Sequence, residues 1–408
     1  MKKIAKLSLV AAVAVAGLTS ANAQPLEEAI KNVDVSGSVV YRYNDYKNDG
    51  DTLNGVAETS DTDNNYKVAL NLSSKVNEDV KFNSRFLVAD ADGAFAATKL
   101  DTQNADDANP GVSLSHAYFG YTGITNTTVN VGKQGLTTPW TTAIDSDGNE
   151  QTGTGALALS TVGPVTLAAA YFNQTNLNLG DSYIGNKSNT TTRTKVSSLI
   201  DGSDDIVTVG AIAAVGPVTM DAWYLDLTDI FDTYTIGAKA SFDVSGIKLG
   251  ADARYVSLNL DDSIATTDNN MAKIVLTADA GLVDAKLAYA MTDKEGGLTA
   301  LDNDATATLL GWNLTSNGKA DADYWQAVLG FDILSNLNLS ANYGNLQYVT
   351  GTTDVEEEEV YAQLLYKMSK NLNTYVRYGT YTNEETTAGN TVDRNDDTRG
   401  RLQVEYTF

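Results

Sequence analysis

The chain closes with Arg401-Leu402-Gln403-Val404-Glu405-Tyr406-Thr407-Phe408, in which the even-numbered residues are apolar and the odd-numbered ones are polar. A period of two places alternate side chains on opposite faces of a β-strand, so this strand lies between two different solvents. The last residue, Phe408, belongs to the apolar face, and no polar tail follows it. A soluble protein gains little from an exposed aromatic residue at its end, whereas a strand that faces lipid gains an anchor.

The other end of the chain has the composition of a signal peptide. A basic start with Lys2, Lys3 and Lys6 is followed by an apolar run over residues 7–18 and by Ala21-Asn22-Ala23, a small-x-small cleavage site. The apolar run is too short to cross a bilayer as a helix, which takes roughly 20 residues. We therefore predict a signal peptide over residues 1–23 and a mature protein over residues 24–408.

An exported chain without a long apolar helix can span a membrane only as a closed barrel, because lipid offers no partner to backbone polar groups. We therefore predict an all-β fold, a transmembrane antiparallel β-barrel in the outer membrane of a Gram-negative cell. Phe408 would then act as an assembly signal on the strand that closes the barrel.

Composition agrees with this fold. Apolar residues make up only 42% of the chain, which suits a barrel whose wet lumen needs an apolar outer belt but no apolar core. Tyrosine (21) outnumbers phenylalanine (9), as expected where rings sit at membrane interfaces. Cysteine is absent, so disulfides and thiol chemistry are excluded. The net charge of −24 disfavours nucleic acid as a partner and favours cations.

Alternating segments and turns predict the number of strands. We expect short turns near residues 74–79, 122–126, 162–164, 215–217, 243–246, 280–283, 333–336 and 368–371. With the two terminal strands, these turns give about 18 strands, enough for an aqueous channel. Residues 304–312 also alternate, but counting them as a nineteenth strand would leave a loop on the wrong side of the membrane. We therefore place them inside a long loop.

The long loops are acidic. Residues 45–63 hold six carboxylates against one lysine, residues 90–107 are similar, and Glu356–Glu359 form an unbroken run. Each loop could simply be a solvated surface. Together they predict a negative vestibule that concentrates cations.

Several segments resemble one family of porins. Residues 25–37 followed by Tyr41-Arg42-Tyr43, then 132–134, 140–141, 143–145, 153–155 and 401–403, are similar to the Campylobacter-type major outer membrane proteins. The resemblance runs along the whole chain in order, although the outer loops match poorly. It implies an 18-stranded homotrimeric general porin whose third loop folds into the pore.

The third loop, residues 135–153, carries the candidate constriction. Its acidic residues Asp145, Asp147 and Glu150 would face cations that strand parity places on the inner wall, namely Arg42, Lys81, Arg85, Arg254 and Arg377. Acid on one side of a narrow gap and base on the other produce a transverse field that aligns small dipolar solutes. The alternative is that these charges only solvate a wet lumen.

The same loop is a candidate cation site. Asp145 and Asp147, approached by Asp181 from the next loop, could supply oxygen ligands to Ca²⁺, although the spacing is not that of an EF-hand. The alternative is a solvated acidic turn, and we expect no required cofactor.

The remaining chemistry argues against an enzyme. The single histidine, His116, has only serines near it in its own strand and no sign of a catalytic triad. We therefore predict a general diffusion porin, weakly cation-selective, that passes ions and small hydrophilic solutes. Two alternatives stay open: a surface adhesin or structural barrel, and a substrate-selective channel, although we find no long ladder of inward arginines or aromatic residues.

Overall fold

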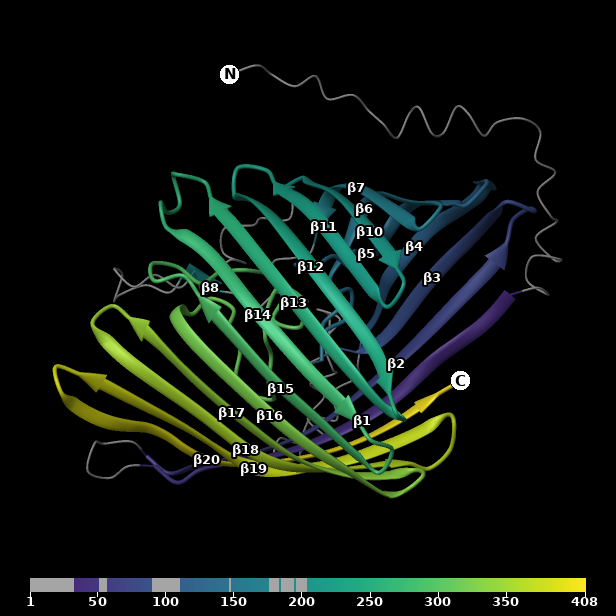
Figure 1. The fold of residues 1–408 in the computed structure, drawn as a ribbon. Helices are drawn as coiled ribbons and strands as arrows, with labels where there is room; N and C mark the ends of the chain where they lie inside the picture. Colours follow the sequence, from purple (N-terminus) through teal and green to yellow (C-terminus); the bar gives the residue numbers. More distant parts are fainter. Residues whose placement is uncertain are drawn as a thin grey trace.

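The structure, a computed structural model, describes residues 33–50, 57–89, 111–146, 148–175, 183–184, 194–195 and 204–408. The predicted signal peptide, residues 1–23, lies outside the described residues. The described chain forms one sheet of eighteen antiparallel strands and a two-residue ribbon (Figure 1). No helix in these ranges is long and apolar enough to cross a membrane.

The strands follow each other around the sheet in chain order. Their bounds are β1 (Val33–Asn48), β2 (Thr59–Lys75), β3 (Val80–Ala89), β4 (Gly111–Ile124), β5 (Thr127–Gly135), β6 (Thr152–Val162), β7 (Val165–Thr175), β10 (Ile206–Val215), β11 (Val218–Leu227), β12 (Phe231–Val244), β13 (Ile247–Leu260), β14 (Asp268–Asp279), β15 (Val283–Thr292), β16 (Ala320–Leu334), β17 (Leu337–Thr350), β18 (Thr353–Lys367), β19 (Leu372–Thr387) and β20 (Asn390–Thr407), with β8 (Tyr183–Ile184) and β9 (Thr194–Lys195) as the ribbon.

The first and last strands close the barrel. β1 pairs with β2 on one side and with β20 on the other, in a register that places Ser38 opposite Thr407. Beyond the last strand residue, the backbone of Phe408 exchanges two hydrogen bonds with Gly37, at 2.9 and 3.1 Å. A Cβ atom on Gly37 would lie 2.2 Å from the Ala69 carbonyl oxygen and 2.8 Å from the Phe408 ring, so this position requires glycine. The closing joint is therefore tightly packed.

All eight predicted short turns lie between consecutive strands. They are at the end of the barrel where β1 begins and β20 ends (Figure 1). Two of these turns have the same sequence, Gly163-Pro164 and Gly216-Pro217, and in both the glycine has φ of +59°. A positive φ at the first turn position matches the twist of the flanking strands, and proline at the second needs no N–H. The prediction of 18 strands is thus confirmed.

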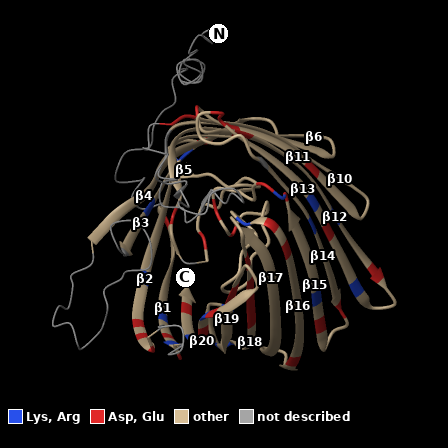
Figure 2. Cartoon of the chain, turned by 90° about the vertical axis from the view of Figure 1, so that its left-hand side faces the viewer, with Lys and Arg blue, Asp and Glu red and all other residues tan. Residues whose placement is uncertain are grey.

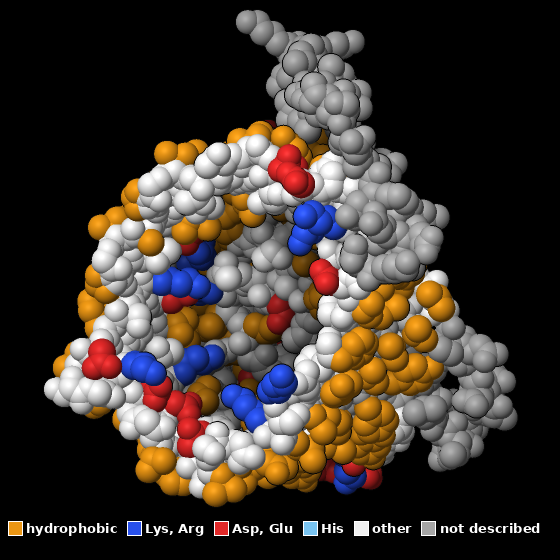
Figure 3. All heavy atoms as spheres, turned by 90° about the vertical axis from the view of Figure 1, so that its right-hand side faces the viewer, with side chains coloured by type: hydrophobic (Ala, Val, Ile, Leu, Met, Phe, Trp, Pro, Cys, Tyr) orange, Lys and Arg blue, Asp and Glu red, His pale blue; other side chains and the backbone are white. Residues whose placement is uncertain are grey.

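The period-two pattern separates the two faces of the wall as expected. Along β13, for example, Leu249 and Tyr255 face outward and are exposed, whereas Arg254 faces the lumen and is buried. Seen from the short-turn end, hydrophobic side chains cover much of the outside, and Lys, Arg, Asp and Glu side chains gather in the hollow among hydrophobic and other residues (Figure 3).

Two expectations about composition and loops need correction. Glu356–Glu359 do not form a loop but lie in β18, because the strands on this side of the barrel continue far past the others. The lumen also holds an apolar core, which we did not expect. It forms where the loop over residues 293–319, which includes residues 304–312, packs against the inner wall and buries Leu298, Leu301 and Leu314.

Deletion of Phe408 is expected to impair barrel closure. The deletion removes both backbone bonds to Gly37 and the ring stack on Tyr406, whose centroid lies 5.9 Å away. We expect a smaller heat-modifiable fraction on gels and less folded protein in the outer membrane. The control is Phe331→Ala, which removes an outward phenylalanine near the short-turn end of β16, away from the joint between β1 and β20. Equal folded fractions for the deletion and the wild type would contradict the assembly role.

Candidate pore constriction

Two long loops meet inside the barrel. The third loop, predicted over residues 135–153, spans residues 136–151 between β5 and β6, and the loop of residues 293–319 joins β15 to β16. Their backbones are hydrogen-bonded: the Leu301 amide donates to the Trp140 carbonyl (2.9 Å) and the Ala307 amide to the Pro139 carbonyl (2.7 Å). Trp140 is fully buried between them. Segments of chain are visible inside the ring of strands from the long-loop end (Figure 2). The two loops therefore form one body that narrows the lumen.

A buried carboxylate fastens the third loop to the wall. Glu150, 1% exposed, lies 2.9 Å from Lys67 Nζ and 2.8 Å from Arg85, and it accepts a hydrogen bond from Ser115. Burial alone would raise the pKa of Glu150, but the hydrogen bonds of Arg85 and Ser115 and the charge of Lys67 hold this pKa below its usual value. Lys67 also donates to the Gly148 carbonyl at 2.6 Å. This group joins the loop to β2, β3 and β4.

The alternation of side chains along the sequence also places Lys67 in the lumen, although we did not name it as a candidate. Its neighbours Tyr66 and Val68 are apolar and belong to the lipid face, so the residue between them faces inward. Arg42 and Arg85 were both named, and both contact the third loop. Arg42 donates to the Ser146 carbonyl at 2.8 Å and to Gln403 at 2.9 Å.

The other predicted cations lie elsewhere on the wall. Lys81 is exposed next to the short turn that precedes β3, four residues from Arg85. Arg254 is buried in a salt bridge of 2.7 Å to Asp221 and donates to Thr235, so its charge is compensated on the wall. Arg377 lies on β19 and lines a pocket together with Ser146 of the third loop.

Of the predicted acidic residues, Asp145 is only partly available to a ligand. Its carboxylate accepts hydrogen bonds from the backbone amide (2.8 Å) and side-chain amide (2.7 Å) of Asn149. Asp147 and Asp181, the other two predicted Ca²⁺ ligands, lie outside the described residues. Among the residues that the structure describes, no three acidic or histidine side chains are grouped as a metal site would require.

The wall also holds the loop of residues 293–319, through contacts that the sequence did not reveal. Glu359 of β18 accepts hydrogen bonds from the backbone amides of Trp312 (3.0 Å) and Asn313 (2.7 Å). Two residues earlier, Glu357 accepts from Lys319 at 3.2 Å and from Tyr348 at 2.8 Å. The side chains of the acidic run therefore alternate between the two faces of β18, and the two that face inward, Glu357 and Glu359, hold the loop.

Arginines of β19 and β20 lie among aromatic rings of the wall and of the loop of residues 293–319. Arg377 on β19 and Arg401 on β20 are direct cross-strand partners. The guanidinium of Arg377 lies 5.0–5.2 Å from the ring centroids of Trp312, Tyr361 and Tyr375. Arg399 lies over two further tyrosines, Tyr46 and Tyr381. Our expectation that the lumen lacks such a ladder was wrong, because Arg399 and Arg401 follow the same parity as the named cations but were not counted.

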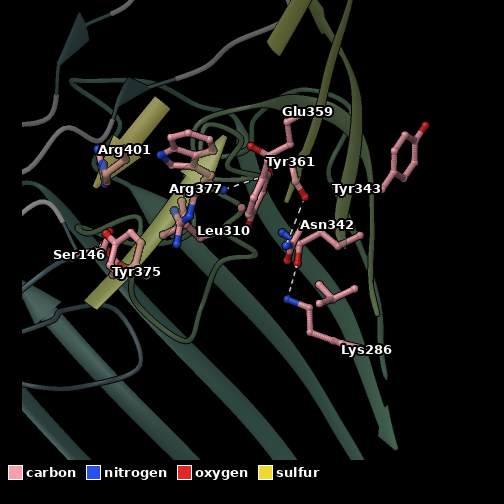
Figure 4. Close-up of a pocket in the computed structure, with 15 residues that line it drawn as sticks. Ser146, Lys286, Leu310, Asn342, Tyr343, Glu359, Tyr361, Tyr375, Arg377 and Arg401 are labelled. Atoms are coloured by element: carbon pink, nitrogen blue, oxygen red, sulfur yellow. Dashed lines mark hydrogen bonds between the residues drawn. The ribbon is translucent and has the colours of Figure 1, made fainter. Parts of the chain in front are cut away.

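A pocket of about 210 Å³ opens between these groups. In Figure 4, Ser146, Tyr375, Arg377 and Arg401 lie on one side of it, and Lys286, Asn342 and Glu359 on the other. Asp304 lines it as well and accepts hydrogen bonds from the amide (3.0 Å) and hydroxyl (3.1 Å) of Ser146. The loop carboxylate and the wall arginines therefore border the same gap.

With this geometry in place, the comparison with family models is decisive. The model of the Campylobacter major outer membrane protein matches residues 1–408. The chain belongs to this family. As a major outer membrane protein, it is a multi-pass β-barrel of the outer membrane and a porin. The comparison with curated proteins gave no match.

Solved porins share the architecture of this major outer membrane protein. OccK5 (OpdH) of Pseudomonas aeruginosa has a TM-score of 0.70 at 16% identity, over 93% of this chain and 98% of that one. OccAB3 of Acinetobacter baumannii has a TM-score of 0.69 at 15% identity, over 92% and 99%. OccK3 (OpdO) of P. aeruginosa has a TM-score of 0.69 at 18% identity, over 94% and 98%. At such identities the likeness concerns the fold alone.

Glu150→Gln is expected to loosen the third loop. The change leaves the buried Lys67 and the half-buried Arg85 without their carboxylate, and breaking a buried pair in this way costs about 3–5 kcal/mol. We expect higher open-channel current noise and a broader distribution of conductances in planar bilayers. Glu58→Gln is the control, since that carboxylate is exposed and pairs with Lys47 at 3.4 Å. Unchanged noise in Glu150→Gln would show that the loop is held by other contacts.

Asp302 makes the joint between the two loops sensitive to pH. Its carboxylate accepts hydrogen bonds from the Gln151 side chain and from the Asp304 amide (2.7 Å). Burial, together with the nearby charges of Asp145 and Asp304, raises the pKa of Asp302 from 3.8 to about 7. The Asp302 carboxyl loses its proton at a higher pH in the folded joint than in the unfolded chain. Its contribution to the stability of the joint is therefore greatest below about pH 4, where it is protonated in both states. That contribution is lost as the pH rises to about 7.

Current noise should therefore increase between pH 4 and 7 and level off above it. Asp302→Asn, which stays neutral throughout, should remove this part of the pH dependence while keeping the wild-type shape. Noise in the wild type and in Asp302→Asn is recorded over pH 4–9 at constant salt. The same pH profile in both proteins would contradict the assignment to Asp302.

Proposed function

We propose that this porin is a weakly cation-selective general diffusion channel for ions and small hydrophilic solutes. One observation carries the proposal: the loop carboxylate of Asp304 and the wall arginines Arg377 and Arg401 border a single narrow gap, in a chain whose net charge is −24. Opposite charges across a gap order water and dipolar solutes and disfavour bulky apolar ones. The excess of carboxylates outside the gap favours cations over anions.

The proposed selectivity has two sources. At the long-loop end of β16–β19, a depression of about 320 Å³ is lined by Asp321, Asp323, Asp354, Glu356 and Glu384. Such exposed charges act over roughly a Debye length, ~10 Å at 0.1 M salt and ~3 Å at 1 M. The charges of the constriction are closer together and partly buried, so salt screens them less.

We also propose a homotrimer. The family supports this assembly, and the outer wall has a shallow apolar depression of about 710 Å³ lined by small residues such as Ala211, Ala213, Ala222, Ala238 and Ala253. Small side chains allow two barrels to approach closely. Ala168 and Ala170 of β7 are also small, but they are buried and face the lumen, so they take no part in this surface.

We propose no enzymatic activity and no required cofactor. His116 faces the packed third loop, and its Nδ1 has no hydrogen-bond partner among the described residues. The proposed Ca²⁺ at the third loop is an accessory ion. Asp145, Asp147 and Asp181 would supply its carboxylates after Asp145 gave up its bonds to Asn149.

The double substitution of Asp145 and Asp147 to asparagine tests the constriction. We expect it to lower the cation preference at 1 M salt, measured as the reversal potential of purified protein in a salt gradient. The control, Asp354→Asn with Glu356→Gln, should lower the preference at 0.1 M but leave it unchanged at 1 M. Recordings with and without chelator report on the accessory ion, because only a bound ion would make chelator raise the noise of the wild type.

The same recordings test the rest of the proposal. Large, ohmic conductance steps in groups of three are expected for a trimer of open pores, and single steps would contradict the trimer. Anion selectivity of the wild type would overturn the charge argument. A barrel that does not conduct would favour the adhesin alternative.

A further inference from the structure

Another pocket of the lumen lies between the third loop and the short-turn end, on the inner wall of β1–β4. Its volume is about 350 Å³, within the range of small-molecule sites. It extends from Asp34 and Ser36 at the start of β1 to Arg85, whose guanidinium holds Glu150 of the third loop. A solute that has passed the pore loops therefore meets this pocket before it leaves the barrel.

Four of the lining side chains form one row across the sheet. Ser73 of β2 lies opposite Asp34 of β1 on one side and opposite Asn83 of β3 on the other. Asn83 lies in turn opposite Tyr118 of β4. Directly opposite residues of an antiparallel pair have Cβ atoms about 5 Å apart, so the four polar groups follow one another closely. We call Asp34, Ser73, Asn83 and Tyr118 the polar row.

The polar row has hydrogen-bonding capacity left. None of its four side chains takes part in a hydrogen bond or an ion pair within the described part of the chain. An amide and a hydroxyl both donate and accept, whereas a carboxylate only accepts. A hydroxyl-rich solute can pair with all of these groups, because each of its hydroxyls both donates and accepts.

The charges of the pocket offer little to an ion. The guanidinium of Arg85 already donates to Glu150 at 2.8–3.0 Å and to Asn71 at 2.8 Å, so an anion would have to compete with a buried carboxylate. Among the described residues, Asp34 is the one carboxylate that lines the pocket, whereas a hard cation takes several oxygen ligands. The pocket therefore favours a solute without net charge.

The last member of the polar row also offers an apolar surface. The residue opposite Tyr118 on β5 is Gly132, so no side chain of that strand stands directly beside the tyrosine. The ring of His116 lies edge-on to that of Tyr118, with 6.4 Å between the ring centroids. An aromatic ring beside hydrogen-bonding groups suits a cyclic solute that has C–H groups on its faces and hydroxyls around its rim.

We propose that the polar row is a binding track for neutral polyhydroxylated solutes of the size of a pyranose monosaccharide. Ser73 and Asn83 bond to hydroxyls, the ring of Tyr118 packs against a C–H face, and Asp34 accepts from hydroxyls near the exit. Each bond replaces one to water and gains little, so the track retains a solute without trapping it. The inference names a solute class for the diffusion channel proposed above and rests on that function.

The test is a titration of the ion current of the purified porin in planar bilayers at pH 6, with four probes. D-galactose is the neutral pyranose, D-galacturonate and D-galactosamine add a negative and a positive charge to the same ring, and triethylene glycol is a neutral molecule of similar mass with few hydroxyls. We expect galactose to reduce the conductance saturably, at the lowest half-saturating concentration of the four. Asn83→Ala and Tyr118→Leu should each raise that concentration roughly fivefold, the effect of losing about one neutral hydrogen bond.

Matched variants separate this effect from misfolding and from a general change of the lumen. Asn373→Ala removes an asparagine at the short-turn end of β19, outside the pocket, and should leave the galactose titration unchanged. Tyr118→Phe keeps the ring without the hydroxyl and should give a value between those of the wild type and Tyr118→Leu. Heat-modifiability on gels shows that each variant is folded.

The outcomes are distinct. Equal effects of galactose and triethylene glycol would mean occlusion without recognition and would overturn the track. A lower half-saturating concentration for galacturonate or galactosamine would replace it with an anion or a cation site. A galactose titration insensitive to both Asn83→Ala and Tyr118→Leu would also overturn the proposal. A wild type that conducts but is not blocked by galactose refutes the track alone, whereas a wild type that does not conduct refutes the channel function itself.

Discussion

The structure depends on one constraint: every backbone N–H and C=O of a strand that crosses lipid needs a partner within the protein. A sheet meets it only if its first and last strands pair, and here β1 and β20 do so along eleven residue pairs before Phe408 bonds to Gly37. Closure fixes an inside and an outside, so the period-two pattern becomes a separation of lipid-facing apolar side chains from lumen-facing polar ones. The pore and its charges follow from this separation.

Inside that wall, two buried carboxylates position the loops that narrow the lumen. Glu150 extends from the third loop to cations on β2 and β3, and Glu359 extends from β18 to backbone amides of the loop of residues 293–319. The loops then join each other through Trp140 and its neighbours. A buried charge without partners is costly, so each carboxylate specifies one location for its loop.

The sequence predicted the barrel well and its interior only in part. Turn chemistry and alternation are local signals, and they gave the strand number and the inward positions of Arg42 and Arg85. The inward fold of residues 293–319 was not predictable, because the alternation in residues 304–312 is that of a wall strand and the apolar residues of the loop pack against strands distant in the sequence. Glu356–Glu359 were misread as a loop, since four consecutive acids hide the alternation that only the register reveals. Arg399 and Arg401 had the right parity, but the glycine between them obscured the pattern.

The two loop-holding carboxylates, Glu150 and Glu359, restrict substitution at different positions of the chain. Glu150 requires a cationic side chain across from it, so a change at Lys67 or Arg85 has to be matched at its partner. Glu359 instead binds main-chain amides of Trp312 and Asn313, and any residue except proline supplies such an amide. The side chain at position 312 can therefore drift without removing these bonds, whereas the side-chain amide of Asn313 also donates to Glu359 at 3.2 Å. Because the ring of Trp312 borders the lumen pocket, this segment is where related pores can diversify the solutes they admit while the scaffold stays the same.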